Sequence, residues 1–286
     1  LRALYTDEWN WRQQEFAREK VEGRWQAGGR MPAIAPADWE RRAAYWKQVL
    51  EALDAIPVAE LSPAERINAA VFRSMVEADY NSAAWRTWEA PFNSDSFFWG
   101  YLAPRQPYVR EGDWERLFGR LRDLPAYFDQ QIANMEQGLA RGWSVPRVSI
   151  EGRDRTLEPY VRADAGNPFL AAIEAMPASI PEPRRSQLQA EGRRLVADNV
   201  VPAYTRLLGF IRDEYMPRAR QTIAARDLPD GEAFYLTQVR EYVTRDMDPA
   251  QIHEIGLAEV ARISAEMREV MARAGFQGSF EEFLHY

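Results

Sequence analysis

Two histidines are the residues of this chain best suited to hold a metal ion or to move a proton. His253 and His285 lie more than thirty residues apart. His253 precedes Glu254, as in the zinc-peptidase motif HExxH, where two histidines one helical turn apart bind zinc and the glutamate activates water. The fourth residue after His253 is Leu257, so the second ligand is missing. We therefore expect no catalytic residue and no metal site within this chain.

Other routes to catalysis find equally little support in the sequence. Cysteine is absent, which removes thiol nucleophiles and thiolate metal sites. Lys20 and Lys47 are the two lysines, and both lie in polar stretches typical of solvated helix faces rather than of a Schiff-base site. There is no nucleophile-elbow motif and no Gly-rich phosphate-binding loop. An independent hydrolase is the least favoured hypothesis.

Tyr235 and Arg240 offer chemistry for binding a ligand. A turn sequence, Leu228-Pro229-Asp230-Gly231, precedes Tyr235, and Arg240 follows five residues after it. The forked donors of arginine and the directional hydroxyl of tyrosine suit the carboxylate or backbone of a peptide-like ligand. The simpler alternative is a turn with a hydrogen-bonded tyrosine and a surface arginine. We take both residues as candidate substrate contacts.

An aromatic segment over residues 81–110 is the second candidate binding region. We expect a long irregular connection, and long loops inside compact domains are often functional. The alternative is that the aromatic side chains only pack the loop onto the body of the protein. Trp99 and Tyr101 are our candidate substrate contacts here. The segment is rich in aromatic residues, namely Trp85, Trp88, Phe92, Phe97, Phe98, Trp99, Tyr101 and Tyr108.

Helical periodicity and helix-capping residues dominate the rest of the chain, whereas strand-like alternation is scarce. Residues 145–150 are predicted as a short strand or an extended arm. A break is expected near Pro125, and a kink or a break at Pro202. The sequence thus predicts a mainly α fold with little β. The expected helices begin or extend over residues 1–26, 38 onward, 62–80, 113–135, 183–216, 249–274 and 279 onward.

Composition and charge exclude several classes of partner. A chain of 286 residues with 46% hydrophobic content can bury a substantial core. Acidic residues number 43 against 36 basic ones, a net charge of -7 that argues against nucleic acid as a partner. No apolar run approaches the roughly 20 residues needed to span a bilayer. We expect a single helical region, 1–286, with a candidate sub-boundary in residues 81–112.

Several tracts resemble the bacterial domain of unknown function 885 family. The main one runs from Asp248 to Val260 and contains the sequence His-Glu-Ile-Gly-Leu from position 253. Further similar tracts are Gly142-Trp143-Ser144-Val145-Pro146-Arg147, Tyr215-Met216-Pro217-Arg218-Ala219-Arg220 and Leu228-Pro229-Asp230-Gly231. Members of this family are typically much longer, largely helical and similar to HExxH zinc peptidases, with a deep cleft between two halves. Their zinc motif lies downstream of the tracts matched here.

The resemblance implies a multi-helix array that forms one half of a helical, cleft-containing metallopeptidase-like fold. This N-terminal half is expected to form one wall of the substrate cleft of a zinc-dependent peptidase. Zinc is expected in the C-terminal half, and the chain is expected to be inactive without it. The implied partners are therefore a peptide substrate and the C-terminal half of the same protein.

Two further expectations follow from the resemblance. Many family members carry export signals, so the bacterial periplasm or another exported location is expected, with the cytoplasm as the alternative. The alternative function is a stand-alone helical module that binds peptides or other partners without catalysis. In that case the aromatic segment between Trp85 and Tyr108 is the expected contact surface.

Overall fold

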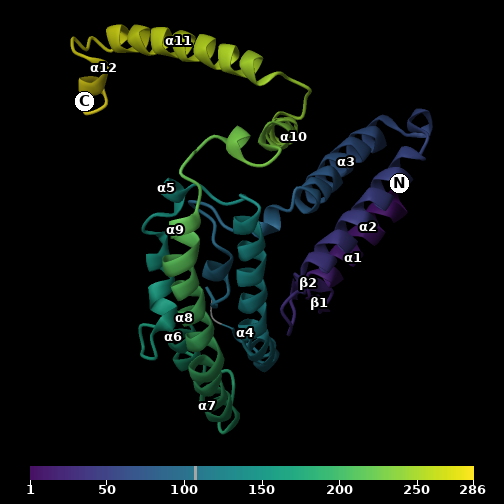
Figure 1. Cartoon of the computed structure of the whole chain (residues 1–286), viewed down its shortest axis with the longest axis vertical. Coiled ribbons are helices and arrows are strands. Elements are labelled where there is room, and N and C mark those ends of the chain that lie inside the picture. Colours follow the sequence, from purple (N-terminus) through teal and green to yellow (C-terminus); the bar gives the residue numbers. More distant parts are fainter. Residues whose placement is uncertain (106–107) are drawn as a thin grey trace. The chain divides into compact units, whose positions relative to one another are not determined.

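The computed structural model describes residues 1–105 and 108–286, and it is mainly α-helical with one two-stranded sheet in these residues (Figure 1). The predicted mainly α class with little β is confirmed. Residues 106 and 107 of the predicted aromatic connection lie outside the described residues. The α-helices are α1 Arg2–Glu15, α2 Pro36–Asp54, α3 Pro63–Ala84, α4 Glu111–Ala140, α5 Arg147–Ile150, α6 Pro168–Glu174, α7 Arg184–Leu195, α8 Val201–Gly209, α9 Met216–Arg218, α10 Gly231–Val243, α11 Pro249–Arg273 and α12 Phe280–Phe283.

Shorter elements join these helices. The strands are β1 Arg18–Val21 and β2 Arg24–Ala27, the 3₁₀ helices are η1 Val58–Glu60, η2 Thr87–Glu89, η3 Phe98–Tyr101, η4 Arg153–Val161 and η7 Ala225–Asp227, and the π-helical turns are η5 Val196–Val200 and η6 Phe210–Tyr215. The chain forms two compact units, Leu1–Glu232 and Ala233–Tyr286.

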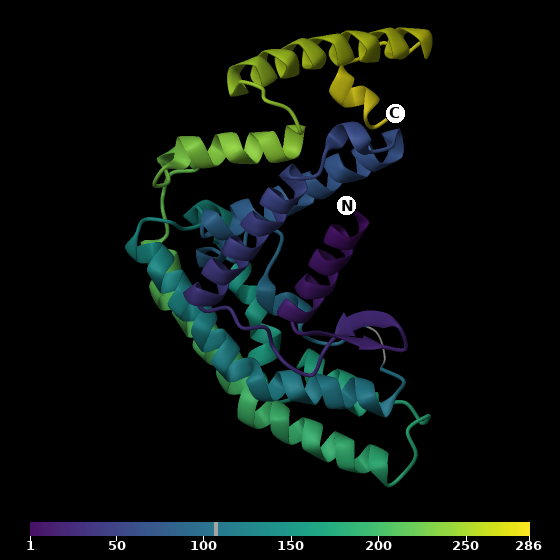
Figure 2. The same cartoon turned by 90° about the vertical axis from the view of Figure 1, so that its right-hand side faces the viewer.

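A β-hairpin replaces the second half of the helix expected over residues 1–26, so that prediction is wrong beyond Glu15 (Figure 2). Ala17 adopts a φ of 52°, which a continuing right-handed helix does not permit. Between β1 and β2, Glu22 and Gly23 have φ values of 49° and 81°. Two consecutive left-handed residues match the twist of antiparallel strands, so the Glu-Gly pair favours a two-residue hairpin.

Helices α1 to α3 share a hydrophobic cluster in which α2 packs along α3. The apolar residues of the cluster recur at helical spacing, because residues three and four apart lie on one face of a helix. Ser62 and Glu65 form a capping box that opens α3. The buried members are Trp46, Val49, Leu53, Phe72, Val76 and Ala83.

A buried cation lies at the edge of this cluster. The side chain of Arg42 is fully buried, and its Nε donates a hydrogen bond to Glu15 at 3.0 Å. A second nitrogen donates to the carbonyl oxygen of Ala33 at 2.5 Å, and the guanidinium stacks on Phe16 and Trp39. Burial lowers the pKa of Arg42, while the Glu15 carboxylate opposes that shift. These partners offset part of the loss of water around the charge.

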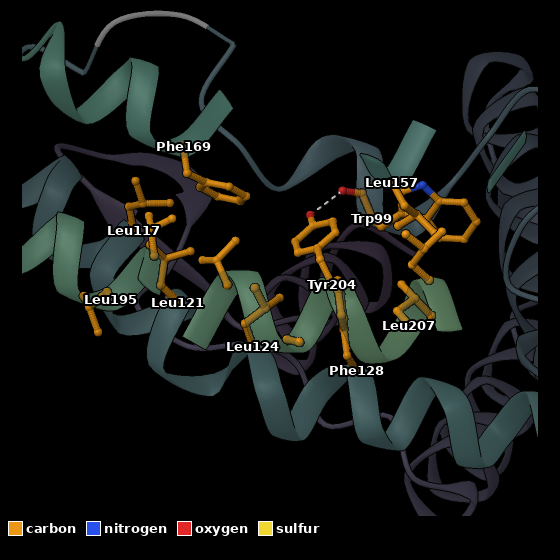
Figure 3. Packing of buried hydrophobic residues seen from close by; sticks show 14 of the residues in the cluster. Trp99, Leu117, Leu121, Leu124, Phe128, Leu157, Phe169, Leu195, Tyr204 and Leu207 are labelled. Carbon is orange, nitrogen blue, oxygen red and sulfur yellow. Dashed lines mark hydrogen bonds between the residues drawn. The ribbon is translucent and has the colours of Figure 1, made fainter. Parts of the chain in front are cut away.

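Helix α4 organises the larger cluster and continues through Pro125, so the break predicted there is wrong. A helix-interior proline loses one backbone hydrogen bond. Leu121, Leu124 and Phe128 are all buried on the inner face around this position, and their burial outweighs that loss (Figure 3). Helix α4 contacts α7 and α8, which bring Leu195 and Leu207 into the same cluster.

The helical stretch predicted over residues 183–216 is present as a continuous run of α7, η5, α8, η6 and α9. Pro202 produces no break. A π-helical turn precedes it, and a second one precedes Pro217. The wider turn accommodates the carbonyl that a proline ring leaves without its usual N–H partner. The periodicity was thus the stronger signal, and proline changed the helix type rather than ending it.

Residues 145–150 are not a strand, because Arg147–Ile150 forms the short helix α5. The backbone N–H of Arg147 donates to the carbonyl of Arg220 at 2.8 Å, and Ile150 is buried. Burial of Ile150 anchors the turn against the larger cluster. The sequence Val-Pro-Arg-Val alternates like a strand, but no neighbouring strand pairs with it among the described residues.

The unit Ala233–Tyr286 contains most of α10 together with α11 and α12. Capping boxes open α11 at Asp248-Gln251 and α12 at Ser279-Glu282. Helix α11 carries an apolar stripe whose side chains are exposed, each by at least 38%: Ile255, Val260, Ile263, Met267 and Val270. Among the described residues, no helix combines the length and apolar character that crossing a membrane requires.

Candidate functional site

A pocket of about 510 Å³ lies within the unit Leu1–Glu232 and includes one of the predicted contacts, Tyr101. We call it the Tyr–Arg pocket. Its described lining contains no aspartate, glutamate or histidine. The polar side chains of the lining are Arg18, Arg30, Arg105, Arg120, Tyr101, Tyr108 and Tyr127, and the apolar ones include Phe16, Met31, Pro32, Leu102 and Pro104.

Three parts of the chain form this pocket. The first is the stretch after α1 with the hairpin and its following segment, the second is the end of η3 with the residues after it, and the third is α4. Arg120 of α4 holds them together, because one of its nitrogens donates to the carbonyl of Gly28 at 2.5 Å. Another nitrogen lies 3.4 Å from the hydroxyl of Tyr108. Gly119 packs so closely on Gly29 that a Cβ atom would overlap the Gly29 carbonyl. The close approach depends on the absence of a side chain at Gly119.

Trp99 and Tyr101 share η3 but have different environments. Trp99 is buried, its indole N–H donates to Thr156 at 3.0 Å, and its carbonyl accepts from the Tyr204 hydroxyl at 2.7 Å (Figure 3). Tyr101 is 54% exposed and carries the guanidinium of Arg105 at 4.3 Å from its ring centroid. Two residues of a 3₁₀ helix span about 240° around its axis, so the side chains diverge. Tyr101 faces the pocket, and Trp99 supports the turn that carries it.

The arginines give the Tyr–Arg pocket an excess of positive charge. Arg30 is neutralised, because Asp123 accepts from its Nε at 2.6 Å and raises its pKa. Arg18 donates to a backbone carbonyl, Arg105 stacks on a ring, and Arg120 bonds to a carbonyl and a hydroxyl. Within the described residues, none of these three forms an ion pair with a carboxylate. Chemically, the arrangement suits an anionic group with an apolar or aromatic neighbour.

Tyr235 and Arg240 both lie on α10, in the unit Ala233–Tyr286. The predicted turn before them forms, with the N–H of Gly231 donating to the carbonyl of Leu228. Five residues of an α-helix span about 500°, which places the two side chains about 140° apart around the axis. Tyr235 is 46% exposed. Arg240 lies 3.5 Å from Asp246 and lines a separate pocket of about 520 Å³. The two residues therefore point to different parts of the surface, and their contact with substrate stays a prediction.

The aromatic connection also lines a second pocket of about 400 Å³, next to α2, α3 and α4. The indole rings of Trp39 and Trp88 lie parallel at its edge, with centroids 6.3 Å apart. Trp88 is nonetheless buried. The aromatic residues thus divide between packing and pocket lining, and a functional role of the connection stays a prediction.

The described residues contain no group of three or more histidine, cysteine or carboxylate side chains arranged to hold a metal ion. His253 and Glu254 lie on the first turns of α11 and are exposed. The donor set within residues 1–105 and 108–286 therefore does not fit zinc. Zinc bound by residues beyond this chain stays a prediction from the resemblance.

The sequence did not single out Arg18, Arg105, Arg120 or Tyr127 as site residues. Arg105 had an available signal, because it follows the exposed Tyr101 within the same aromatic segment. The others come from β1 and from α4, whose proximity depends on long-range packing. Burial raises the pKa of Tyr127, whose hydroxyl accepts a hydrogen bond from Gln131 at 3.0 Å.

The architecture and this pocket define a mainly α-helical protein with a cationic, aromatic site in its larger unit. The chain belongs to the family described as bacterial protein of unknown function (DUF885), whose model matches residues 21–286. The crystal structure of a candidate lipoprotein from Colwellia psychrerythraea is similar over 88% of this chain, with a TM-score of 0.73 and 20% sequence identity.

This chain covers 46% of the Colwellia psychrerythraea chain, which is less than half of its length. At 20% identity the likeness shows a shared fold, and a fold alone does not determine function. None of the curated proteins matches. The family membership is thus confirmed, while the relation to HExxH zinc peptidases stays a prediction.

Proposed function

We propose that this chain forms one wall of the substrate cleft of a larger, peptidase-like protein. In this proposal the chain binds and orients a peptide, and residues outside it supply zinc and the group that activates water. The family resemblance is the source of the peptidase assignment. The covered share of the similar structure, 46%, supports a larger protein, because it leaves room for a second half of comparable size.

The observation that carries the proposal is the exposed apolar stripe of α11. A helix with one apolar face normally buries that face against another element. Here Val260, Ile263 and Met267 remain exposed by 65%, 45% and 38%. Contiguous exposed apolar surface on a helix is typical of a docking interface. We assign this stripe to contact with the C-terminal half.

The substrate contacts within this proposal are Tyr101, Tyr235 and Arg240, with Trp99 as the residue that supports Tyr101. Tyr101 has the strongest structural support, because it is exposed and lines the Tyr–Arg pocket. An exported, periplasmic location is part of the same proposal. It is supported by the description of the similar structure as a candidate lipoprotein.

The test uses the complete protein that contains this chain. With zinc restored after EDTA treatment, we expect it to hydrolyse members of a mixed peptide library followed by mass spectrometry, and we expect the 286-residue chain alone to leave them intact. Hydrolysis that is unaffected by EDTA, or its absence from the zinc-loaded protein, contradicts the proposal. A native polypeptide that ends at Tyr286 contradicts it as well.

A matched pair of variants tests the role of α11. In the complete protein, Ile263→Lys should lower both hydrolysis and thermal stability, since it places a charge in the apolar stripe. Glu269→Lys adds a lysine on the other side of the same helix, about 120° away, and should change neither. Equal effects of the two variants would remove the stripe from the proposal.

The alternative is a stand-alone helical module that binds peptides without catalysis. It is favoured by one observation, namely that the Tyr–Arg pocket is formed entirely within Leu1–Glu232. Peptide binding to the 286-residue chain that EDTA does not alter, together with no hydrolysis by the complete zinc-treated protein, is the result that selects this alternative.

A further inference from the structure

We propose that the Tyr–Arg pocket binds a small organic anion, with its carboxylate or phosphate head between Arg105 and Arg120 and an aromatic or apolar tail on the tyrosine rings. This inference goes beyond the proposed function, because it concerns binding by this chain and holds whether or not the complete protein cleaves peptides.

The charge balance of the lining is the first support. Arg30 is satisfied by Asp123, which also accepts from the backbone N–H of Met31 at 3.0 Å. The carboxylate of Glu19, on the hairpin, is engaged by the N–H of Gly29 at 2.9 Å. Arginine remains charged at any physiological pH and has five N–H donors. The three arginines without a carboxylate partner among the described residues therefore leave donors for an external anion.

The second support is the way in which two guanidinium groups are held. The Arg105 guanidinium lies over the ring of Tyr101, and the Arg120 guanidinium is fixed by the Gly28 carbonyl. A stacked or hydrogen-bonded guanidinium loses less conformational entropy when it binds an anion. Neither interaction neutralises the charge. The geometry is thus preorganised for a charge-assisted contact.

The remaining lining suits the tail of such a ligand. Tyr101, Tyr108 and Tyr127 supply aromatic surface, and Phe16 and Met31 add apolar surface from the end of α1 and from the segment after β2. The cavity volume of about 510 Å³ falls within the range typical of small-molecule sites. A ligand with an anionic head alone would leave most of this apolar surface uncovered.

Three probes of similar size test the proposal by isothermal titration calorimetry on the 286-residue chain. Benzoylglycine carries a carboxylate, phenyl phosphate carries a phosphate, and benzoylglycinamide is neutral. We expect at least one acidic probe to bind at least about tenfold more tightly than the amide, because charge-assisted hydrogen bonds are stronger than neutral ones. The better acid identifies the head group. Equal affinity for all three probes, or no binding by either acid at millimolar concentration, overturns the proposal.

Two charge-matched variants establish where the anion binds. Arg105→Gln should lower the affinity for the acidic probe by about tenfold and leave the affinity for the amide unchanged. The variant should fold, since Arg105 makes no hydrogen bond that the fold requires in the described residues. Arg194→Gln removes the same charge from an exposed position outside the pocket and should leave affinity unchanged. Circular dichroism of both variants confirms folding. Equal losses in the two variants would show non-specific attraction to positive charge and overturn the assignment.

Discussion

At the scale of single residues, two buried tyrosines fix neighbouring backbone, and one of them supports the candidate site. The hydroxyl of Tyr204 donates to the carbonyl of Trp99 at 2.7 Å and so fixes η3, which presents Tyr101. Tyr215 accepts from the backbone N–H of Val145 at 3.2 Å. Burial raises the pKa of Tyr204 well above its ordinary value of 10.0, and it raises the pKa of Tyr215 to about 12. Both tyrosines favour the protonated form in the folded state.

These pKa shifts predict a loss of stability in alkali. A pKa raised by folding stabilises the protein below the unfolded value, and that contribution is lost as pH rises through the folded value. The free energy of unfolding should therefore fall from about pH 10 upward, a trend that urea denaturation between pH 7 and pH 11 measures.

Replacing one of these hydroxyls separates its contribution. Tyr204→Phe should lower the free energy of unfolding by about 1–2 kcal/mol at neutral pH, because the Trp99 carbonyl loses its donor. It should also make the decrease in the free energy of unfolding above pH 10 less steep. Tyr242→Phe, at a position that is 82% exposed, should do neither. An unchanged dependence of the free energy of unfolding on pH above pH 10 in Tyr204→Phe would contradict this explanation.

At the scale of elements, the approach of the hairpin segment to α4 depends on the absence of a side chain at Gly119. A Cβ atom there would overlap the carbonyl of Gly29. Gly256, on α11, has no neighbour within 4 Å of a Cβ atom. The same substitution thus meets opposite surroundings on two long helices.

We predict effects of opposite sign at these two glycines. Gly119→Ala should destabilise the protein by about 1–3 kcal/mol, because the overlap forces backbone to move. It should also lower the affinity for the acidic probe, since Arg120 would lose its alignment with Gly28. Gly256→Ala should stabilise α11 by about 0.5–1 kcal/mol, because alanine lowers the entropy of the unfolded chain. Chemical denaturation and probe titration measure the effect of Gly119→Ala, and the loss of helical circular dichroism on heating measures that of Gly256→Ala. Stabilisation by Gly119→Ala would contradict the packing described for the pocket.

At the scale of the whole molecule, the buried hydrophobic residues are distributed unevenly between the two units. Both hydrophobic clusters draw their buried members from Leu1–Glu232. In the described residues of Ala233–Tyr286, Val239 and Met271 are the buried hydrophobic residues. The larger unit thus contains the core, and the smaller one consists of helices with mostly exposed side chains.

This distribution predicts that residues 1–232 fold alone. The second unit contributes no buried member to either hydrophobic cluster. The shortened chain should therefore keep a cooperative thermal transition, with a midpoint temperature within a few degrees of that of the 286-residue chain. Residues 233–286 alone should show helical circular dichroism without a cooperative transition. Differential scanning calorimetry measures both, and the loss of cooperativity in residues 1–232 would show that the core depends on the second unit.

The sequence by itself determined the helices, because their signals are local. The capping boxes at Ser62 and Asp248 and the apolar periodicity of residues 183–216 each act within a few turns of one helix. The tracts that carry the family resemblance are local too, because each is a short run of consecutive residues. They failed where two local tendencies competed, as at Pro125, where burial of the flanking leucines outweighs the missing hydrogen bond.

Only the tertiary structure decided the candidate site. Arg120 reaches the carbonyl of Gly28 across 92 positions of sequence, and no local pattern encodes that contact. Trp99 and Tyr101 are equivalent candidates in the sequence, yet the fold buries the first and exposes the second. Burial and long-range proximity depend on how all the helices pack at once, and this is why a pocket of arginines and tyrosines could not be assembled from spacing alone.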